Sequence, residues 1–305
     1  MDELLKEALS LYDFENPISD FIRHNENMTY KIQDGKKKYV LRIHIPKKDF
    51  DLSLFPKDRV SEAVNLLLYI NNKSDMLIQK PIKNKKGEYI TTLSNHELVT
   101  VLSWIEGDAL SKETAKSRAY DIALMATRLH KAMKGFMGNL PKYDELMVDR
   151  VKLKIQEAVN MNHINTEQGN ICILMLNKIR MTILKLKDSD NYDVIHADLG
   201  FGNIIDSEGS LVPIDFSLAG YGAYAQECGM IASNYSSDDD LLKIIEGFHQ
   251  GNESISSKDA KIFLAFSVLL FIGAQHSRYY QEEWFIQGMH RWTETIFSPL
   301  LVNQD

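Results

Sequence analysis

A short stretch near residue 200 concentrates side chains that could bind a metal ion and move a proton. His196, Asp198 and Asn203 lie within eight residues, and Asp215 follows 12 residues after Asn203. Phosphoryl transfer needs oxygen ligands that hold magnesium against the phosphates. It also needs a carboxylate that orients the attacking hydroxyl and accepts its proton. Two aspartates and an asparagine at these spacings can divide these tasks.

The glycines of this stretch bear on how its side chains are aimed. We expect Gly200 and Gly202 to let the backbone turn sharply, so that Asp198 and Asn203 face one site. A lone aspartate after a strand usually caps a turn or a helix. Three polar residues in this order, each next to an expected strand, favour a functional site instead.

The pattern H-x-D-x-x-x-x-N, followed by I-D-F at residues 214–216, resembles the aminoglycoside phosphotransferase and choline kinase superfamily, which has the protein-kinase-like fold. The resemblance implies that ATP and Mg²⁺ are the cofactors and that Asp198 is the catalytic base. It implies that Asn203 and Asp215 bind the magnesium, and that His196 supports the loop.

Two residues of the segment E-N-x-T-Y, Asn27 and Thr29, are implied by the same resemblance to lie over the nucleotide phosphates. Small polar side chains and backbone amides in a turn between strands can approach phosphate closely. A generic hairpin explains this segment equally well on its own.

Arg42 lies in a stretch, residues 39–43, that resembles the strand carrying the phosphate-binding cation. Protein kinases have lysine there, and an arginine can neutralise phosphate with a planar fork. Glu62 matches the helix acid that pairs with this cation.

The stretch around residues 102–108 resembles the connector between the lobes, where adenine bonds backbone groups. Here these would be the Ser103 carbonyl and the Ile105 amide, and Gly107 would let the chain turn into the next lobe.

Departures from the protein-kinase pattern point to a small acceptor. Ala197 and Gly200 replace the usual arginine and lysine, and Asp215 runs directly into residues 217–222 without a long activation segment. Extended docking of a peptide is therefore disfavoured. Glu227 stands where the family has an acid that anchors the catalytic loop, and we expect His130 to pack against that loop.

The elements around these residues predict an α+β, bilobal protein-kinase-like fold. It has a small N-lobe of antiparallel sheet plus helix and a large, mainly helical C-lobe. We expect the nucleotide-binding lobe at residues 1–102, the connector at 103–107 and the catalytic and acceptor-binding lobe at 108–305.

Hydrophobic periodicity gives the elements. Alternation predicts strands over residues 28–33 and 38–44, and strand-like composition predicts strands over 88–93 and 97–102. A short apolar segment predicts a strand over 192–195, and a second hairpin pattern predicts strands over 203–206 and 211–215. Helical spacing predicts a helix after Pro56, helices within 115–133 and 146–186, and further helix from about residue 241. The aromatic residues near the C-terminus, within 276–285, are expected to pack into the core, although with the acids beside them they could hold a cationic amine.

Composition limits the partners. The chain has 305 residues and a formal net charge of −7, which argues against nucleic acid or an anionic membrane surface and slightly favours cationic acceptors. The longest apolar run, Ile262–Ala274, is too short to span a membrane and predicts a buried helix. The acidic start of the chain and its two cysteines favour a cytoplasmic protein without disulfides.

The predicted function is transfer of the γ-phosphoryl group of ATP to a hydroxyl of a small molecule. An aminoglycoside, choline or ethanolamine, homoserine and a sugar all remain open as acceptors. Two other classes also remain, a nucleotide-binding pseudoenzyme and a metal-dependent hydrolase that uses Asp198 and Asp215. The sequence does not indicate an oligomeric state.

Overall fold

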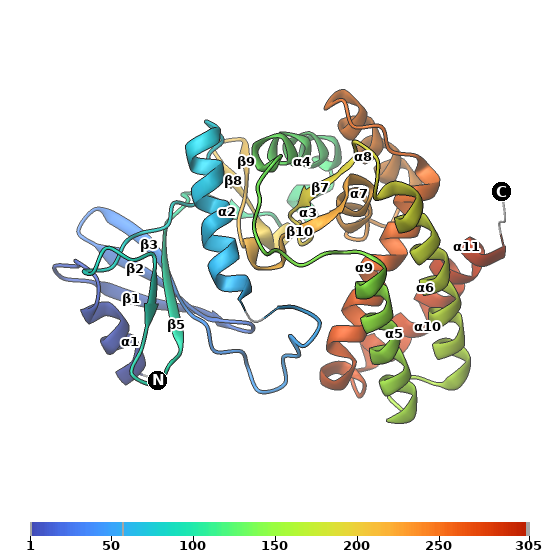
Figure 1. Ribbon diagram of the computed structural model, residues 1–305, viewed down its shortest axis with the longest axis horizontal. Helices are drawn as coiled ribbons and strands as arrows, with labels where there is room; N and C mark the ends of the chain where they lie inside the picture. The colour runs from blue at the N-terminus through green and yellow to red at the C-terminus, as the bar shows by residue number, and fades with distance from the viewer. Residues whose placement is uncertain (1, 57, 303–305) are drawn as a thin grey trace.

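A computed structural model describes residues 2–56 and 58–302, which form two lobes (Figure 1). The N-lobe is a five-stranded antiparallel sheet in the order β1-β2-β3-β5-β4 with two helices. Its elements are α1 (Asp2–Ser10), β1 (Ile18–His24), β2 (Met28–Asp34), β3 (Lys37–Ile43), α2 (Arg59–Lys73), β4 (Ile90–Thr92) and β5 (Leu98–Ser103).

The C-lobe is mainly helical and carries a two-stranded sheet, β7–β10, and a three-stranded sheet, β6-β8-β9. This division confirms the predicted fold class. Its elements are β6 (Asp108–Ala109), α3 (Lys112–Ala115), α4 (Ala119–Met133), α5 (Glu145–Asn160), α6 (Thr166–Leu186), β7 (Tyr192–Ile195), η1 (Phe201–Asn203), β8 (Ile204–Ser207), β9 (Ser210–Pro213), η2 (Phe216–Leu218), β10 (Gly220–Ala223), α7 (Tyr224–Ala232), α8 (Asp238–Gln250), α9 (Ser257–Tyr279), α10 (Glu283–Trp292), η3 (Thr293–Phe297) and α11 (Ser298–Val302).

The β2–β3 hairpin carries residues that reach the cleft. The strands pair from Met28 opposite Ile43 to Asp34 opposite Lys37. Gly35 in the turn has φ +60°, a left-handed conformation that glycine adopts without a steric penalty. The hairpin predicted from Asp34-Gly35 is therefore confirmed.

Two elements of the N-lobe were not predicted. Leu5 of helix α1 and Tyr12, which follows the helix, pack against sheet residues such as Ile32 and Leu41. Strand β1 is almost wholly exposed, so it lacks the alternation by which strands are recognised. It pairs along the edge of β2.

A second hydrophobic cluster joins the lobes behind the cleft. It brings Leu66 of α2 and Leu102 of β5 together with Met133 of α4 and Phe216 of η2. Gly107 then directs the chain into β6 with φ +129°, and a Cβ atom there would lie 2.1 Å from the Asp206 carbonyl oxygen. Only glycine fits this turn, as expected from the sequence.

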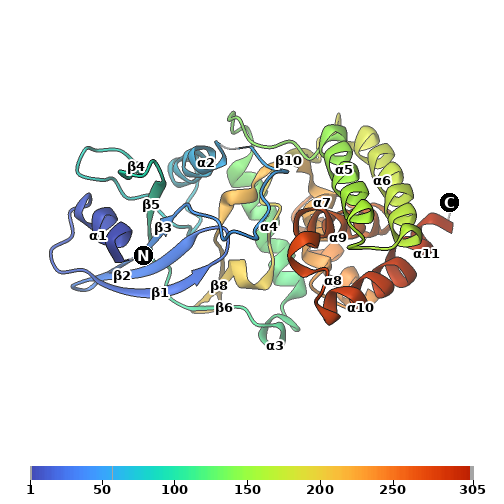
Figure 2. The ribbon, with the colours of Figure 1, turned by 90° about the horizontal axis from the view of Figure 1, so that it is seen from below.

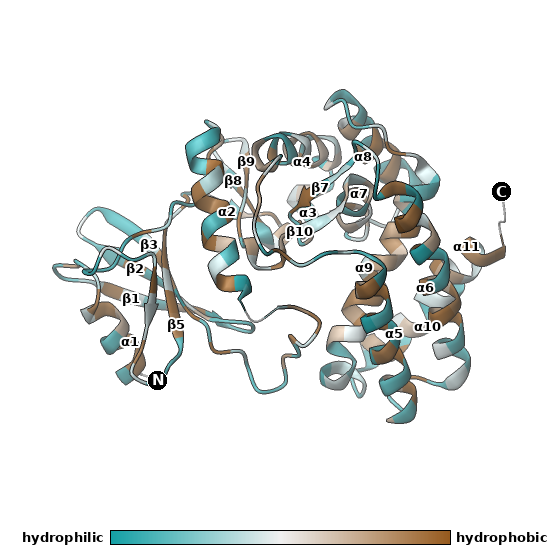
Figure 3. Cartoon of the chain, viewed as in Figure 1, coloured by the Kyte–Doolittle hydropathy of each residue, from teal (hydrophilic) through white to brown (hydrophobic). Residues whose placement is uncertain are grey.

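Helix α9 is the central helix of the C-lobe and contacts α5, α6, α7 and α8. Its residues are mostly hydrophobic (Figure 3). In the described ranges it is the one helix long and apolar enough to cross a membrane, but most of it is buried inside the protein, as in a core helix. The buried helix predicted for Ile262–Ala274 is thus confirmed.

The segment between β3 and α2, residues 44–56, crosses from the N-lobe to the C-lobe (Figures 1 and 2). We call it the β3–α2 loop. Asp51 pairs with Lys154 of α5 at 2.8 Å, and Asp49 pairs with Arg278 of α9 at 3.3 Å. This loop closes one end of the cleft, an arrangement that the sequence did not predict.

Candidate active site

Asp198 and Asn203 lie together on the loop that follows β7. Asn203 Nδ2 donates to Asp198 Oδ2 at 2.8 Å and to the Asp198 carbonyl oxygen at 3.0 Å. The two side chains predicted to share one site therefore do so. Since the amide nitrogen is turned toward Asp198, the Asn203 Oδ1 remains available as an oxygen ligand.

The sharp turn of this loop is made by Ala197, and the expectation that glycines make it is wrong. Ala197 has φ +62°, whereas neither Gly200 nor Gly202 has a positive φ. A left-handed alanine is strained and needs support from its surroundings. Glu227 supplies that support, because its carboxylate accepts hydrogen bonds from the His196 amide at 2.5 Å and the Ala197 amide at 3.1 Å. The predicted anchoring role of Glu227 is confirmed.

His196 is a structural part of the loop, as expected. Its Nε2 donates to the Ile214 carbonyl oxygen at 3.1 Å, and its Nδ1 accepts from the Asp198 amide at 3.3 Å. Burial lowers the pKa of His196, so the ring is neutral and can donate from one nitrogen while it accepts at the other. The ring thereby ties the Asp198 loop to the strand that precedes Asp215.

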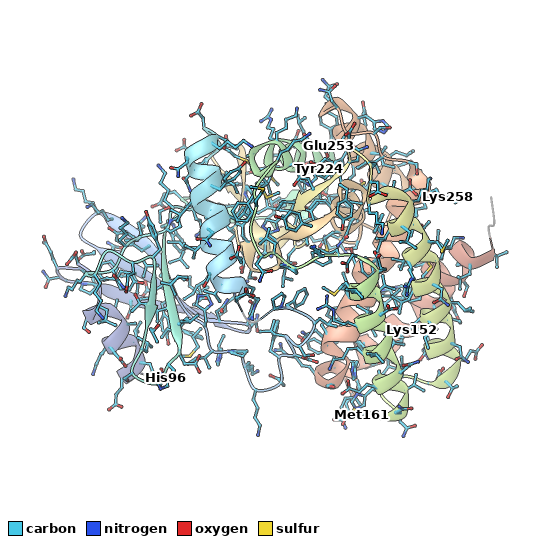
Figure 4. All side chains as sticks on the ribbon, viewed as in Figure 1. His96, Lys152, Met161, Tyr224, Glu253 and Lys258 are labelled. Carbon is cyan, nitrogen blue, oxygen red and sulfur yellow. The ribbon has the colours of Figure 1, made fainter. Side chains whose placement is uncertain are left out.

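A buried histidine lies behind the anchor. His130 Nδ1 donates to Glu253 Oε2 at 2.9 Å, and its Nε2 lies 3.6 Å from Glu227 Oε2. Burial alone would lower the pKa of His130, but Glu227 and Glu253 outweigh it and raise the pKa to about 9. The ring also stacks on Tyr224, with 4.1 Å between the ring centroids. Figure 4 shows Tyr224 and Glu253 near each other in the C-lobe. His130 therefore packs behind the catalytic loop, as predicted.

Asp215 faces the cleft from the C-lobe, where it is met by two arginines of the N-lobe. Its Oδ1 accepts from Arg42 Nη1 at 2.9 Å and its Oδ2 from Arg23 Nη2 at 3.2 Å. Burial would raise the pKa of Asp215, but the charges of Arg42 and Arg23 hold it below its usual value. The carboxylate therefore stays charged. Arg23 was missed because its exposed strand carries no signal.

The predicted pairing of Arg42 with Glu62 is wrong. Arg42 pairs with Asp215, and the Glu62 carboxylate instead accepts from the Asn139 amide at 3.0 Å. Helix α2 presents Arg59 toward the cleft, where it pairs with Glu26 at 3.2 Å. Glu62 therefore fastens α2 to the segment between α4 and α5.

The two residues predicted to lie over the phosphates are buried in the β1–β2 turn and β2. Asn27 Oδ1 accepts from His44 Nδ1 at 2.7 Å, and Thr29 lies opposite Arg42 in the sheet. Burial lowers the pKa of His44 to about 3, so its other nitrogen accepts from Thr100 Oγ1 at 2.9 Å. The Asn27 side chain is thus occupied in fixing the turn.

The connector offers backbone groups for a purine. Ile105 is buried, and its amide donates to no group in the described part of the chain. The Ser103 carbonyl accepts from Gln79 Nε2 at 3.3 Å and retains a second lone pair. Both positions suit the adenine contacts that the sequence predicted.

Asp198 has the electrostatics of a base. Burial raises its pKa well above the usual value, and the charges of Asp215 and Glu26 raise it further. Glu26 is itself held by Arg59 and by Ser217 Oγ at 3.1 Å. A carboxylate with a raised pKa accepts a proton more readily at neutral pH. Glu26 was not among the predicted site residues, although it begins the E-N-x-T-Y segment.

The residues of the cleft fit a magnesium ion shared with a nucleotide. Across residues 2–56 and 58–302, no three His, Cys, Asp or Glu side chains are grouped to hold a metal by themselves. Magnesium is usually held by one or two protein oxygens together with substrate phosphates. The charged Asp215 and the available Asn203 Oδ1 are donors of that kind, and Arg42 adds a cation for phosphate.

Sequence comparison agrees with this geometry. The sequence pattern of the phosphotransferase enzyme family (APH) matches residues 20–259. The chain belongs to this family. Amicoumacin kinase of Bacillus subtilis (strain 168) is 21% identical over 240 residues, which cover 76% of this chain and 68% of that protein. The family predicted from the residues is confirmed.

Solved structures share the phosphotransferase fold over nearly the whole chain. A microcompartment-associated aminopropanol kinase is similar with a TM-score of 0.76 and 16% identity, covering 95% of this chain and 94% of that one. The amicoumacin kinase hAmiN, in complex with AMP-PNP, Ca²⁺ and Ami, has a TM-score of 0.76 and 18% identity, covering 98% and 95%. Choline kinase LicA from Streptococcus pneumoniae has a TM-score of 0.70 and 14% identity, covering 96% and 97%.

Proposed function

We propose that this phosphotransferase moves the γ-phosphoryl group of ATP to a hydroxyl of a small molecule, with Asp198 as the base. The observation that carries the proposal is the convergence of Asp198, Asn203 and Asp215 on one cleft, with Arg42 facing them from the other lobe. A pseudoenzyme would not need the paired Asp198 and Asn203 side chains to face an Asp215 carboxylate that is held by Arg42.

Each residue has a separate task. Asp198 orients the acceptor hydroxyl and takes its proton as the oxygen attacks the γ-phosphorus. Asn203 and Asp215 hold magnesium, which neutralises the developing charge on the phosphates when it is bound. Arg42 steadies the phosphates from β3, and the connector holds the adenine through Ser103 and Ile105.

Positioning accounts for most of the rate in this reaction class. Glu227 fixes the Asp198 loop through two backbone amides, and His196 ties that loop to the strand before Asp215. The general base and the metal ligands are therefore held by one connected set of hydrogen bonds.

Release of ADP by the purified full-length protein tests the proposal. The protein is incubated with Mg²⁺ and ATP and with a panel of aminoglycosides, choline, ethanolamine, homoserine and simple amino alcohols. We expect one acceptor class to stimulate ADP release, with a phosphorylated acceptor detected by mass spectrometry. ATP binding without stimulation by any acceptor would support the pseudoenzyme, and turnover of a substrate in the absence of ATP would support the hydrolase.

A further inference from the structure

A cavity of about 300 Å³ opens beside Asp198 on the side where an acceptor would enter. Its walls come from both lobes, because the β3–α2 loop closes it against α7 and α9. The volume is at the lower end of the range for small-molecule pockets, which indicates a compact ligand.

Aromatic and aliphatic side chains form most of this wall. They include Phe50 and Phe55 of the β3–α2 loop, Tyr143, Met230 of α7, and Phe271 and Tyr279 of α9. The Tyr143 hydroxyl already donates to the Leu218 carbonyl oxygen at 2.7 Å, so Tyr143 presents its ring to the cavity and not a free polar group. A wall of this composition gains free energy by burying apolar ligand surface.

Two of the three acidic side chains that line the cavity have basic partners. Glu26 pairs with Arg59 at 3.2 Å, and Asp51 pairs with Lys154 at 2.8 Å. Among the acids that line the cavity, Asp198 is the one without a basic partner, and its proposed task is to take a proton from the acceptor. A ligand with several ammonium groups would find no spare carboxylates to replace its hydration, so a polycation is disfavoured.

Two buried glutamines with an unpartnered carbonyl oxygen line the cavity within the described part of the chain, Gln226 and Gln275. Gln275 is partly engaged, because its Nε2 donates to the Asp51 carbonyl oxygen at 3.5 Å, so Gln226 is the freer of the two for ligand recognition. Gln226 of α7 lines the cavity and is 2% exposed, and its side chain forms no hydrogen bond within the part of the chain that the structure describes. A buried amide without partners is costly unless a ligand or water completes it. Gln226 and Asp198 line the same cavity, so a ligand whose hydroxyl lies at Asp198 can also reach the Gln226 amide.

We propose that the acceptor is a compact amphiphile, with a hydroxyl at Asp198, one hydrogen-bonding group read by Gln226, and an apolar, ring-bearing body held by the aromatic wall. It carries at most one positive charge. This inference rests on the proposed function, since it concerns the acceptor of the same reaction. It excludes polycationic aminoglycosides from the candidate acceptors. It also assigns the β3–α2 loop a part in selecting the acceptor.

Calorimetric titration of the full-length protein with AMP-PNP and Mg²⁺ tests the inference without turnover. The ligands are 2-amino-3-phenylpropan-1-ol, 2-aminopropan-1-ol and kanamycin. The first two share one amino-alcohol head and differ by a phenyl ring. We expect the phenyl compound to bind at least about tenfold more tightly than its partner, because its ring is buried against the wall.

Two variants localise the effect, and one serves as a control. Phe50→Ala, at a half-buried loop position, should reduce the preference for the phenyl compound severalfold. Gln226→Met should weaken both amino alcohols by a similar factor without loss of thermal stability, because it removes an unpartnered buried amide. Phe50 is half-buried and lies under the guanidinium of Arg278, 5.7 Å from the ring centroid. Tyr89 on the N-lobe is likewise a half-buried ring under a cation, Lys83, so Tyr89→Ala is the control and should leave all three affinities unchanged.

Equal affinity for the two amino alcohols, no detectable binding of the phenyl compound at millimolar concentration, or tighter binding of kanamycin would overturn the inference. These results are distinct from failure of the proposed function. That failure would appear as absent phosphorylation of every acceptor by an enzyme that still binds ATP.

Discussion

The guanidinium of Arg42 and the carboxylate of Asp215 are joined by a hydrogen bond of 2.9 Å between Nη1 and Oδ1, which connects β3 of the N-lobe to the segment between β9 and η2 in the C-lobe. Both side chains are about nine-tenths buried. The pair places the cation for phosphate beside the carboxylate for magnesium, so nucleotide and metal are expected to bind together at this point. Removing Asp215 would leave the buried Arg42 charge without this partner, and removing Arg42 would leave the buried Asp215 with only the partly exposed Arg23.

Arg42→Ala should therefore impair both nucleotide use and stability. We expect the KM for ATP to rise on the order of tenfold or more, because a charged contact to phosphate is lost. The free energy of unfolding should fall by about 3 kcal/mol. ADP-release kinetics at varied ATP, together with urea unfolding, measure the two effects.

Arg23→Ala is the matched control for that variant. Arg23 contacts the same carboxylate at 3.2 Å, but its side chain is 43% exposed. The Arg23–Asp215 pair should therefore contribute no more than about 1 kcal/mol to the free energy of unfolding. A KM for ATP that stays at its wild-type value in Arg42→Ala would contradict the phosphate role of Arg42.

Glu227→Gln should lower kcat more than it changes the KM for ATP. The carboxylate accepts hydrogen bonds that support the left-handed Ala197, and it faces the charged His130. A neutral amide has one acceptor oxygen and no charge, so it can replace only part of these interactions. We expect a loss of about 3 kcal/mol in the free energy of unfolding. The exposed Glu246→Gln on α8 should change neither quantity, and a Glu227→Gln enzyme with wild-type kcat would show that the anchor is dispensable.

His130 makes stability depend on pH. Because its pKa is raised to about 9 in the folded protein, its contribution is fully present below the unfolded pKa of about 6.5 and is lost as pH rises through about 9. We compare the free energy of unfolding of wild type and His130→Gln at pH 6 and at pH 9.5. The difference between the two proteins should be smaller by about 3 kcal/mol at the higher pH. A stability difference that is the same at both pH values would contradict a charged His130.

The local parts of this account could be predicted from the sequence. Strand β7 has the predicted bounds, Tyr192–Ile195, because its apolar run stands out from its polar surroundings. Asp198 and Asn203 are five residues apart, so their meeting is decided within one loop.

The remaining features depend on contacts between distant segments. The pairing of Arg42 with Asp215 in place of Glu62 is decided by how the lobes are placed, which no local pattern records. Ala197 takes the left-handed turn because Glu227, 30 residues later, holds its amide. The β3–α2 loop has no periodicity of its own and is fixed by Lys154 and Arg278.

The most direct test of the account is the turnover of Asp198→Asn with an acceptor that stimulates the wild-type enzyme. The account predicts a fall in kcat of at least about a hundredfold, the usual contribution of a general base. Binding of ATP and Mg²⁺, measured by calorimetry, should stay close to wild type, since Asn203, Asp215 and Arg42 are retained. A variant that turns over at a near-normal rate would contradict the assignment of Asp198 as the base.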